Sequence, residues 1–248
     1  MKTAEYGKSG LPTVVLLHGG GLSCWNHREA AEDLAADHRV ILPVLDGHAG
    51  SGRPFTSIED NAAEIIEFID RELGGRVDVL GGLSLGAQTV LEMLSQRGEI
   101  CRHAVIESAA VIPQKLTNAL IGPAFGSSYG LIKQQWFARL QFKSLKIKED
   151  LFEDYYRDSC AITKQDLTAF MKASTSYSLK EEALRSCRAC VHVYAGEKET
   201  RTVRYSAQAI VGAVPGAELT VLPGLYHGEF SLNHAREFAA ALRSFLQS

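Results

Sequence analysis

Short apolar runs alternate with segments of helical periodicity along most of the 248-residue chain. The runs are rich in β-branched residues and most lack polar alternation, which predicts strands buried on both faces. We place them at residues 13–18, 39–42, 77–80, 103–106, 191–195 and 219–222. Helices are expected between them, at residues 58–73 with Ser57 as N-cap, 87–94 and 238–245. This alternation predicts an α/β fold, with a mostly parallel central sheet covered by helices on both faces.

One interval breaks the rhythm. Residues 113–187 contain no convincing buried strand but do contain amphipathic helical stretches, at 132–140 and 150–156. A structureless loop of that length is improbable in a compact domain, so we interpret the interval as a helical cap inserted into the fold. The sequence therefore predicts a core made of residues 1–112 and 188–248, with the cap at 113–187.

Charge and composition exclude several classes of protein. The net charge of −3 is too small and of the wrong sign to hold a phosphate backbone, so no nucleic-acid partner is expected. No stretch approaches the roughly 20 apolar residues of a membrane span, and we expect no signal peptide, anchor or membrane partner. Five cysteines do not suggest a disulfide framework, which fits a cytoplasmic location. The oligomeric state is not predicted.

The strongest chemical signal is Gly82-Leu83-Ser84-Leu85-Gly86, between a predicted strand and a predicted helix. A serine on a tight strand-to-helix turn needs small neighbours two positions away, because Cβ atoms there would collide with the backbone. Glycines occupy both positions, so the pattern predicts Ser84 as a nucleophile held above the sheet. The amide of Leu85, at the start of the helix, is expected to donate to an oxyanion.

A second glycine-rich segment, His18-Gly19-Gly20-Gly21, follows the first predicted strand. Glycines let the backbone approach a ligand, so we place a second oxyanion donor at Gly20 and expect Gly19 and Gly21 to border the substrate. His18 is expected to be a structural hydrogen-bonding residue, because its position ahead of the nucleophile fits the loop and not the base. Trp25 is a candidate pocket wall or a core residue.

A serine nucleophile needs a general base that is oriented by a carboxylate. His227 is the candidate base, because it lies on a loop at the same sheet edge as Ser84. Glu199 follows the preceding strand and gives the chain order Ser, acid, His. Glu107 ends the strand after the nucleophile and is the alternative acid, with Glu197 as a weaker candidate.

These motifs, together with Asp46-Gly47-His48-Ala49-Gly50-Ser51, resemble the α/β-hydrolase superfamily in their order along the chain. The resemblance covers nearly the whole chain outside residues 113–187, which match the position of the family's cap domain. It implies an enzyme with a helical cap that shapes the substrate pocket. The family usually has Asp where Glu199 stands, and some relatives place a Glu one strand after the nucleophile, as with Glu107. The loop around His48 is a shortened version of the family's, which favours a simple turn there.

The predicted function is hydrolysis of a small carboxylic ester or related acyl substrate through an acyl-enzyme. No metal or organic cofactor is required for that chemistry. The same scaffold also carries thioesterases, C–C bond hydrolases and lyases, and a non-catalytic ligand receptor is a further alternative. The physiological substrate and its chain length are not predicted.

Overall fold

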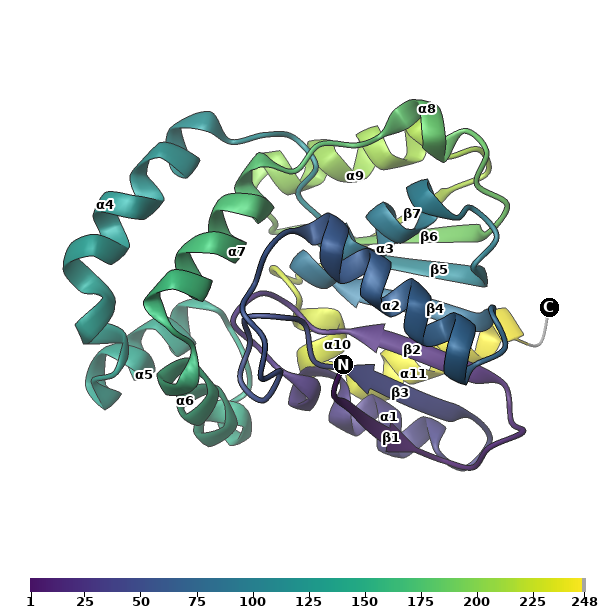
Figure 1. Ribbon diagram of the computed structural model, residues 1–248, viewed down its shortest axis with the longest axis horizontal. Helices are drawn as coiled ribbons and strands as arrows, with labels where there is room; N and C mark the ends of the chain where they lie inside the picture. The colour runs from purple at the N-terminus through teal and green to yellow at the C-terminus, as the bar shows by residue number, and fades with distance from the viewer. Residues whose placement is uncertain (247–248) are drawn as a thin grey trace.

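A seven-stranded sheet forms the centre of the protein, whose computed structural model describes residues 1–246 apart from the side chain of Ser127 (Figure 1). The strands lie in the order β1-β3-β2-β4-β5-β6-β7. Their bounds are β1 Thr3–Tyr6, β2 Thr13–Leu17, β3 Arg39–Pro43, β4 Val77–Leu83, β5 Cys101–Glu107, β6 Cys190–Gly196 and β7 Glu218–Leu222. All neighbours are parallel except β1 and β3. The predicted α/β fold is confirmed.

The registers bring the chemically interesting strand ends to one edge of the sheet. Gly82 of β4 pairs with Leu17 of β2, and Leu83 pairs with Glu107 of β5. Parallel strands end on the same side of a sheet. This edge therefore brings together Ser84, the segment after Leu17 and the end of β5.

Two edge strands differ from the sequence prediction. Strand β1 was not predicted, since it is four residues long and only half-buried on one edge. Strand β7 was expected to be buried on both faces, and that expectation is wrong. It is the opposite edge strand, and Val221 is 52% exposed. An edge strand lacks a neighbour on one side, so its apolar composition alone does not make it buried.

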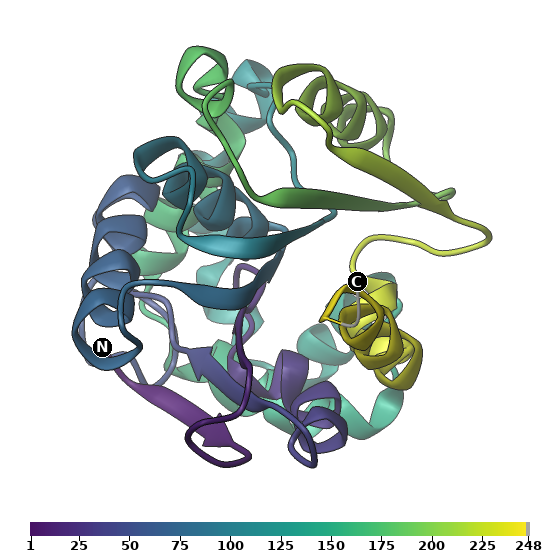
Figure 2. The ribbon, with the colours of Figure 1, turned by 90° about the vertical axis from the view of Figure 1, so that its right-hand side faces the viewer.

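Helices cover both faces of the sheet (Figure 2). Helices α2 (Ile58–Glu72), α3 (Leu85–Gln96) and α9 (Arg201–Ala213) pack on one face, and α1 (Arg28–Leu34) and α11 (Ala235–Leu246) on the other. The short elements η1 (Cys24–His27) and α10 (Glu229–Asn233) precede α1 and α11. The expected N-cap of α2 is present, because the Ser57 hydroxyl accepts a hydrogen bond of 2.9 Å from the Asp60 amide.

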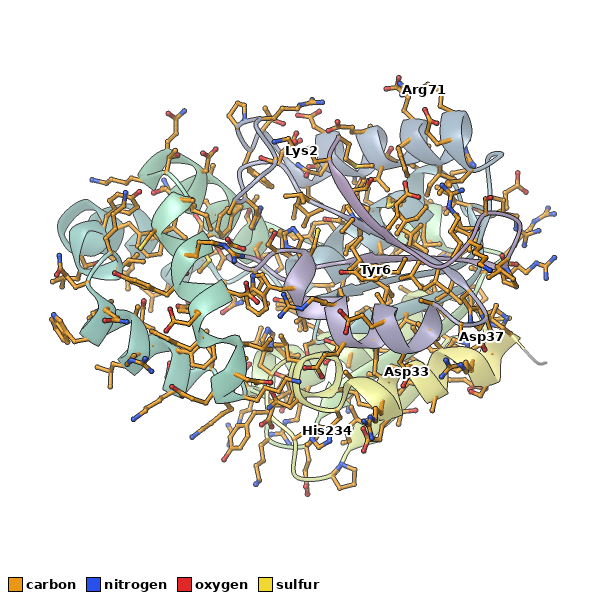
Figure 3. The ribbon with its side chains drawn as sticks, turned by 90° about the horizontal axis from the view of Figure 1, so that it is seen from below. Lys2, Tyr6, Asp33, Asp37, Arg71 and His234 are labelled. Atoms are coloured by element: carbon orange, nitrogen blue, oxygen red, sulfur yellow. The ribbon has the colours of Figure 1, made fainter. Side chains whose placement is uncertain are left out.

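The helices on the second face are joined by charge as well as by packing. Arg243 of α11 forms ion pairs with Asp33 at 2.5 Å and with Asp37 at 3.0 Å. Figure 3 shows both aspartates directed toward α11. These ion pairs join the last helix to α1 and to the turn that follows it.

Helices are the only regular secondary structure in the described part of the interval between β5 and β6. They are α4 (Lys115–Ile132), α5 (Gln135–Ser144), η2 (Glu149–Leu151), α6 (Phe152–Ala161), α7 (Lys164–Ser176) and α8 (Glu181–Leu184). The helix predicted at 132–140 is wrong in its boundary. Ile132 ends α4 and a new helix begins at Gln135, with Lys133 and Gln134 forming the break. Figure 1 places α4 to α7 beyond the ends of the parallel strands.

The division into a core and a cap at residues 113–187 stays an interpretation. Within residues 1–246, no helix is long and apolar enough to cross a membrane.

Candidate active site

Ser84 occupies a strained turn between β4 and α3. Its backbone has φ +53° and ψ −109°, and a positive φ is uncommon for a residue other than glycine. A Cβ on Gly82 would lie 2.4 Å from the carbonyl carbon of Gly86, and one on Gly86 would lie 2.3 Å from the Leu17 oxygen. The two glycines are thus required by contact with backbone atoms. The turn is also held by the Ser84 amide, which donates to the Glu107 carbonyl at 2.8 Å.

His227 lies on the loop between β7 and α10, and its ring contacts a buried carboxylate. Nδ1 of His227 is 3.0 Å from Oε2 of Glu199, whose side chain is fully buried. An ionised carboxylate only accepts hydrogen bonds, so Nδ1 carries the proton and Nε2 is the basic nitrogen. Ser84 and His227 line the same cavity of about 270 Å³. Among the described residues no direct hydrogen bond joins the two side chains.

The second oxygen of Glu199 is held by a residue that the sequence analysis missed. The Ser108 hydroxyl donates to Oε1 of Glu199 and accepts a 3.2 Å hydrogen bond from the amide of Gly228, next to His227. Ser108 is buried and has φ +56°, a second strained residue at this sheet edge. No sequence pattern marks it. Its only signal is its place directly after Glu107, at the end of a strand.

Glu107 is buried beside this group but does not contact the imidazole. Its Oε1 accepts a 3.2 Å hydrogen bond from the Ser231 amide, and its Oε2 has no hydrogen-bond partner among the described residues. Burial raises the pKa of Glu107 to about 7, although the hydrogen bond from the Ser231 amide opposes that shift. Glu197 accepts from the amide of Gly224 at 2.8 Å. Of the three candidate acids, only Glu199 therefore meets His227.

The electrostatics of His227 follow from these carboxylates. The side chain of His227 is 46% exposed, and partial desolvation by its neighbours alone would lower its pKa. The hydrogen bond from His227 to Glu199 and the negative charges of Glu199 and Glu107 outweigh this desolvation and raise the pKa above its ordinary value. The two carboxylates therefore stabilise the protonated imidazole relative to the neutral one.

The glycine loop after β2 leaves one amide free. The Gly19 amide donates to Oδ1 of Asn26, and the Gly21 amide donates to Nε2 of His48, each at 3.0 Å. The Gly20 amide has no hydrogen-bond partner among the described residues, and neither has the amide of Leu85 at the start of α3. A Cβ on Gly20 would lie 3.6 Å from the Cβ of Leu85, so the two segments are adjacent. Two uncommitted N–H groups thus lie next to Ser84.

Two buried histidines support this loop. Nε2 of His18 accepts from the Leu45 amide at 3.1 Å, and Nδ1 donates to the Gly19 carbonyl at 2.9 Å. His48 packs on Phe170 of α7, with ring centroids 4.4 Å apart. Burial lowers the pKa of His18 well below its usual range and that of His48 to about 4, so both rings are neutral. The expected turn at His48 is present, but its imidazole also links the glycine loop to α7, a role the sequence analysis missed.

The expected wall residues fall into two groups. Gly19 lines the cavity of Ser84, and Gly21 lines an adjoining cavity of about 180 Å³. Trp25 is not among the described residues that line either one. It is 5% exposed, belongs to an apolar cluster, and its indole N–H donates to Asp158 at 3.0 Å. Of the two alternatives for Trp25, the structure favours the core residue.

Comparison with known proteins identifies the family and agrees with the fold. The model of the alpha/beta hydrolase family matches residues 14–241. No curated protein sequence matches the chain at a significant level. An esterase from Thermogutta terrifontis is 18% identical with a TM-score of 0.79, the alignment covering 99% of this chain and 92% of that one. An enol-lactonase from Burkholderia xenovorans LB400 is 14% identical with a TM-score of 0.83, at 100% and 96% coverage. MenH from S. aureus is 14% identical with a TM-score of 0.78, at 99% and 97%.

Proposed function

Because the chain belongs to the alpha/beta hydrolase family, we propose that it is a serine hydrolase, carboxylesterase-like, that cleaves a small carboxylic ester. One observation carries the proposal. A histidine oriented by a fully buried glutamate lines the same cavity as a serine on a strained strand-to-helix turn. This combination supplies a nucleophile, a base and a group that orients the base, which are the parts that acyl transfer requires.

In the proposed mechanism, Nε2 of His227 takes the proton of Ser84 as Oγ attacks the ester carbonyl. The carbonyl oxygen becomes an oxyanion that accepts hydrogen bonds from the amides of Gly20 and Leu85. Glu199 stabilises the imidazolium, which then gives its proton to the departing alcohol. Water attacks the acyl-enzyme with the same base, and the carboxylic acid leaves as Ser84 regains its proton.

Substitution of the three side chains tests this assignment. Ser84→Ala and His227→Ala should each lower kcat for a p-nitrophenyl ester by at least ~1000-fold, since residues of such a group act together. Glu199→Gln should cost far more turnover than Glu107→Gln, because only Glu199 contacts the imidazole. If the wild-type protein turns over no ester, thioester or lactone, the non-catalytic receptor becomes the better explanation. A larger loss in the Glu107 variant would reverse the choice of acid.

The chemistry of the leaving group is the remaining choice. An ester, a thioester and a lactone all present a carbonyl to Ser84 and develop the same oxyanion. A panel of p-nitrophenyl esters beside one thioester and one lactone therefore ranks the alternatives. We expect the esters to have the highest kcat/KM.

A further inference from the structure

Two cavities that share lining residues lie next to each other at the glycine loop. The catalytic cavity, which contains Ser84 and His227, is about 270 Å³. The distal cavity, of about 180 Å³, is lined by residues of α4, α5, α6 and α7 and by the glycine loop. Four residues line both of them: Gly20, Leu22, Leu145 and Met171. The two cavities are therefore neighbours, and Gly20 lies at the border between them.

The lining of both cavities is uncharged. Apart from His227, no described residue that lines either of them is titratable at neutral pH. The polar side chains in the distal cavity are those of Gln141, Tyr155 and Ser159. A fixed charge placed there would lose its hydration without gaining a partner of opposite sign, which is costly.

Two buried carboxylates on the helices that line the distal cavity are engaged elsewhere. Asp158 of α6 accepts from the Trp25 indole and pairs with Arg157 at 2.8 Å. Asp166 of α7 accepts from the Phe55 amide at 2.9 Å and from the Thr163 hydroxyl. Neither carboxylate is thus free to receive a cationic substrate, and Arg157 is bound to Asp154 as well.

We propose that the distal cavity is a subsite for an uncharged apolar group of the substrate, about the size of a benzene ring, while the scissile carbonyl lies at Ser84. The size follows from its volume, because an engineered apolar cavity of about 150 Å³ is known to hold benzene. This inference rests on the proposed esterase function. It selects neutral esters with one bulky apolar group and excludes substrates that carry a carboxylate or an ammonium group on that side.

The first test compares p-nitrophenyl pentanoate with the p-nitrophenyl monoester of succinic acid, whose acyl chain is of similar length but ends in a carboxylate. When the acyl group is the part of the ester that enters the distal cavity, the expected kcat/KM is at least ~100-fold lower for the charged ester, because its carboxylate would be buried without a partner. Both reactions are measured with Ser84→Ala as the background.

The second test fills the distal cavity. Ser159 is half-buried on α6 and lines only that cavity of the two, so Ser159→Phe places a ring inside it. Gln165→Phe, at an exposed position of α7, makes a similar change outside the cavity and is the matched control. Ser159→Phe should lower kcat/KM at least ~10-fold for either p-nitrophenyl benzoate or phenyl acetate, depending on which side of the ester enters the cavity. Turnover of ethyl acetate should change less than ~2-fold, which also verifies that the variant is folded.

The outcomes separate the two proposals. If no ester is cleaved in a manner that depends on Ser84, the proposed function is overturned and this inference with it. If cleavage depends on Ser84 but Ser159→Phe leaves both bulky esters unaffected, only the distal subsite is overturned. The same holds if Ser159→Phe lowers kcat/KM for p-nitrophenyl benzoate, so that the acyl group enters the cavity, and yet the charged and neutral acyl esters react equally well. A variant that loses ethyl acetate turnover is replaced by Ile162→Phe, which enlarges a buried residue of the same cavity.

Discussion

Replacing Glu107 by Gln should make the protein more stable at alkaline pH. The carboxyl group is 2% exposed, and one of its oxygens has no hydrogen-bond partner among the described residues. Glutamine keeps an oxygen for the Ser231 amide but carries no charge, so the variant avoids the cost of burying a carboxylate. It also keeps the contact between His227 and Glu199 and should remain active.

The magnitude follows from proton linkage. The pKa of Glu107 rises from the ordinary value of 4.5 to about 7 in the folded protein. Below pH 4.5 the group is protonated in both states and costs nothing. As the pH rises toward 7 the unfolded chain loses the proton first, so the wild-type protein is progressively destabilised. This rise of about 2.5 in the pKa corresponds to roughly 3 kcal/mol of lost unfolding free energy in the wild-type protein. The loss is complete once the pH is well above 7.

Urea unfolding of both proteins at pH 5 and pH 8 measures this effect. The free energy of unfolding of Glu107→Gln relative to wild type should increase by roughly 2.5 kcal/mol between the two pH values. Glu99→Gln, at an exposed position before β5, is the matched control and should show no such increase. If the Glu107 variant shows the same difference from wild type at both pH values, the carboxyl is not buried as described and the reasoning fails.

Three further predictions concern the same sheet edge. Removing the Ser108 hydroxyl should lower kcat/KM by about 10- to 100-fold in both Ser108→Gly and Ser108→Ala, since a hydrogen bond to a carboxylate is lost. Ser108→Gly should have a higher melting temperature than Ser108→Ala, because glycine accepts φ +56° without strain. Full activity in Ser108→Gly would refute a role for the hydroxyl. The kcat/KM of the wild type should fall as the pH drops through the pKa of His227, above 6.5, because the base must be neutral; a flat profile from pH 8 to 5 would contradict this. Gly86→Ala should lower the free energy of unfolding by more than ~3 kcal/mol or prevent folding, because its Cβ would meet backbone atoms. Gly212→Ala in α9 has open space at its Cβ and should leave that free energy unchanged or raise it by up to ~1 kcal/mol, as measured by thermal unfolding.

The sequence predicts most of this fold because each signal is local. Glycines 82 and 86 flank a serine between a strand pattern and a helix pattern, and the structure places backbone atoms within 2.4 Å and 2.3 Å of the Cβ positions there. Ser57 precedes a helical repeat and caps α2. Strand β7 was misjudged because its apolar residues indicate a strand but not its position in the sheet order.

The choice of acid is not local, so the sequence favours Glu199 by its chain order but leaves Glu107 as an alternative. Glu199 and Glu107 both follow or end parallel strands, so both reach the same sheet edge. The orientation of the side chains decides between them. Ser108 holds the Glu199 carboxylate toward His227, while Glu107 turns to the amide of Ser231. The link between His48 and the glycine loop likewise joins segments 27 residues apart, and no periodicity reports such a contact.

The most direct measurement is the mass of the intact protein after treatment with a fluorophosphonate, followed by mapping of the labelled peptide. An activated serine displaces fluoride and gains one phosphonyl group, whereas an ordinary serine hydroxyl stays unmodified. The account predicts a single adduct on Ser84 in the wild type, strong loss of labelling in His227→Ala, and none in Ser84→Ala. An unlabelled wild type, or an adduct on a different residue, would contradict it.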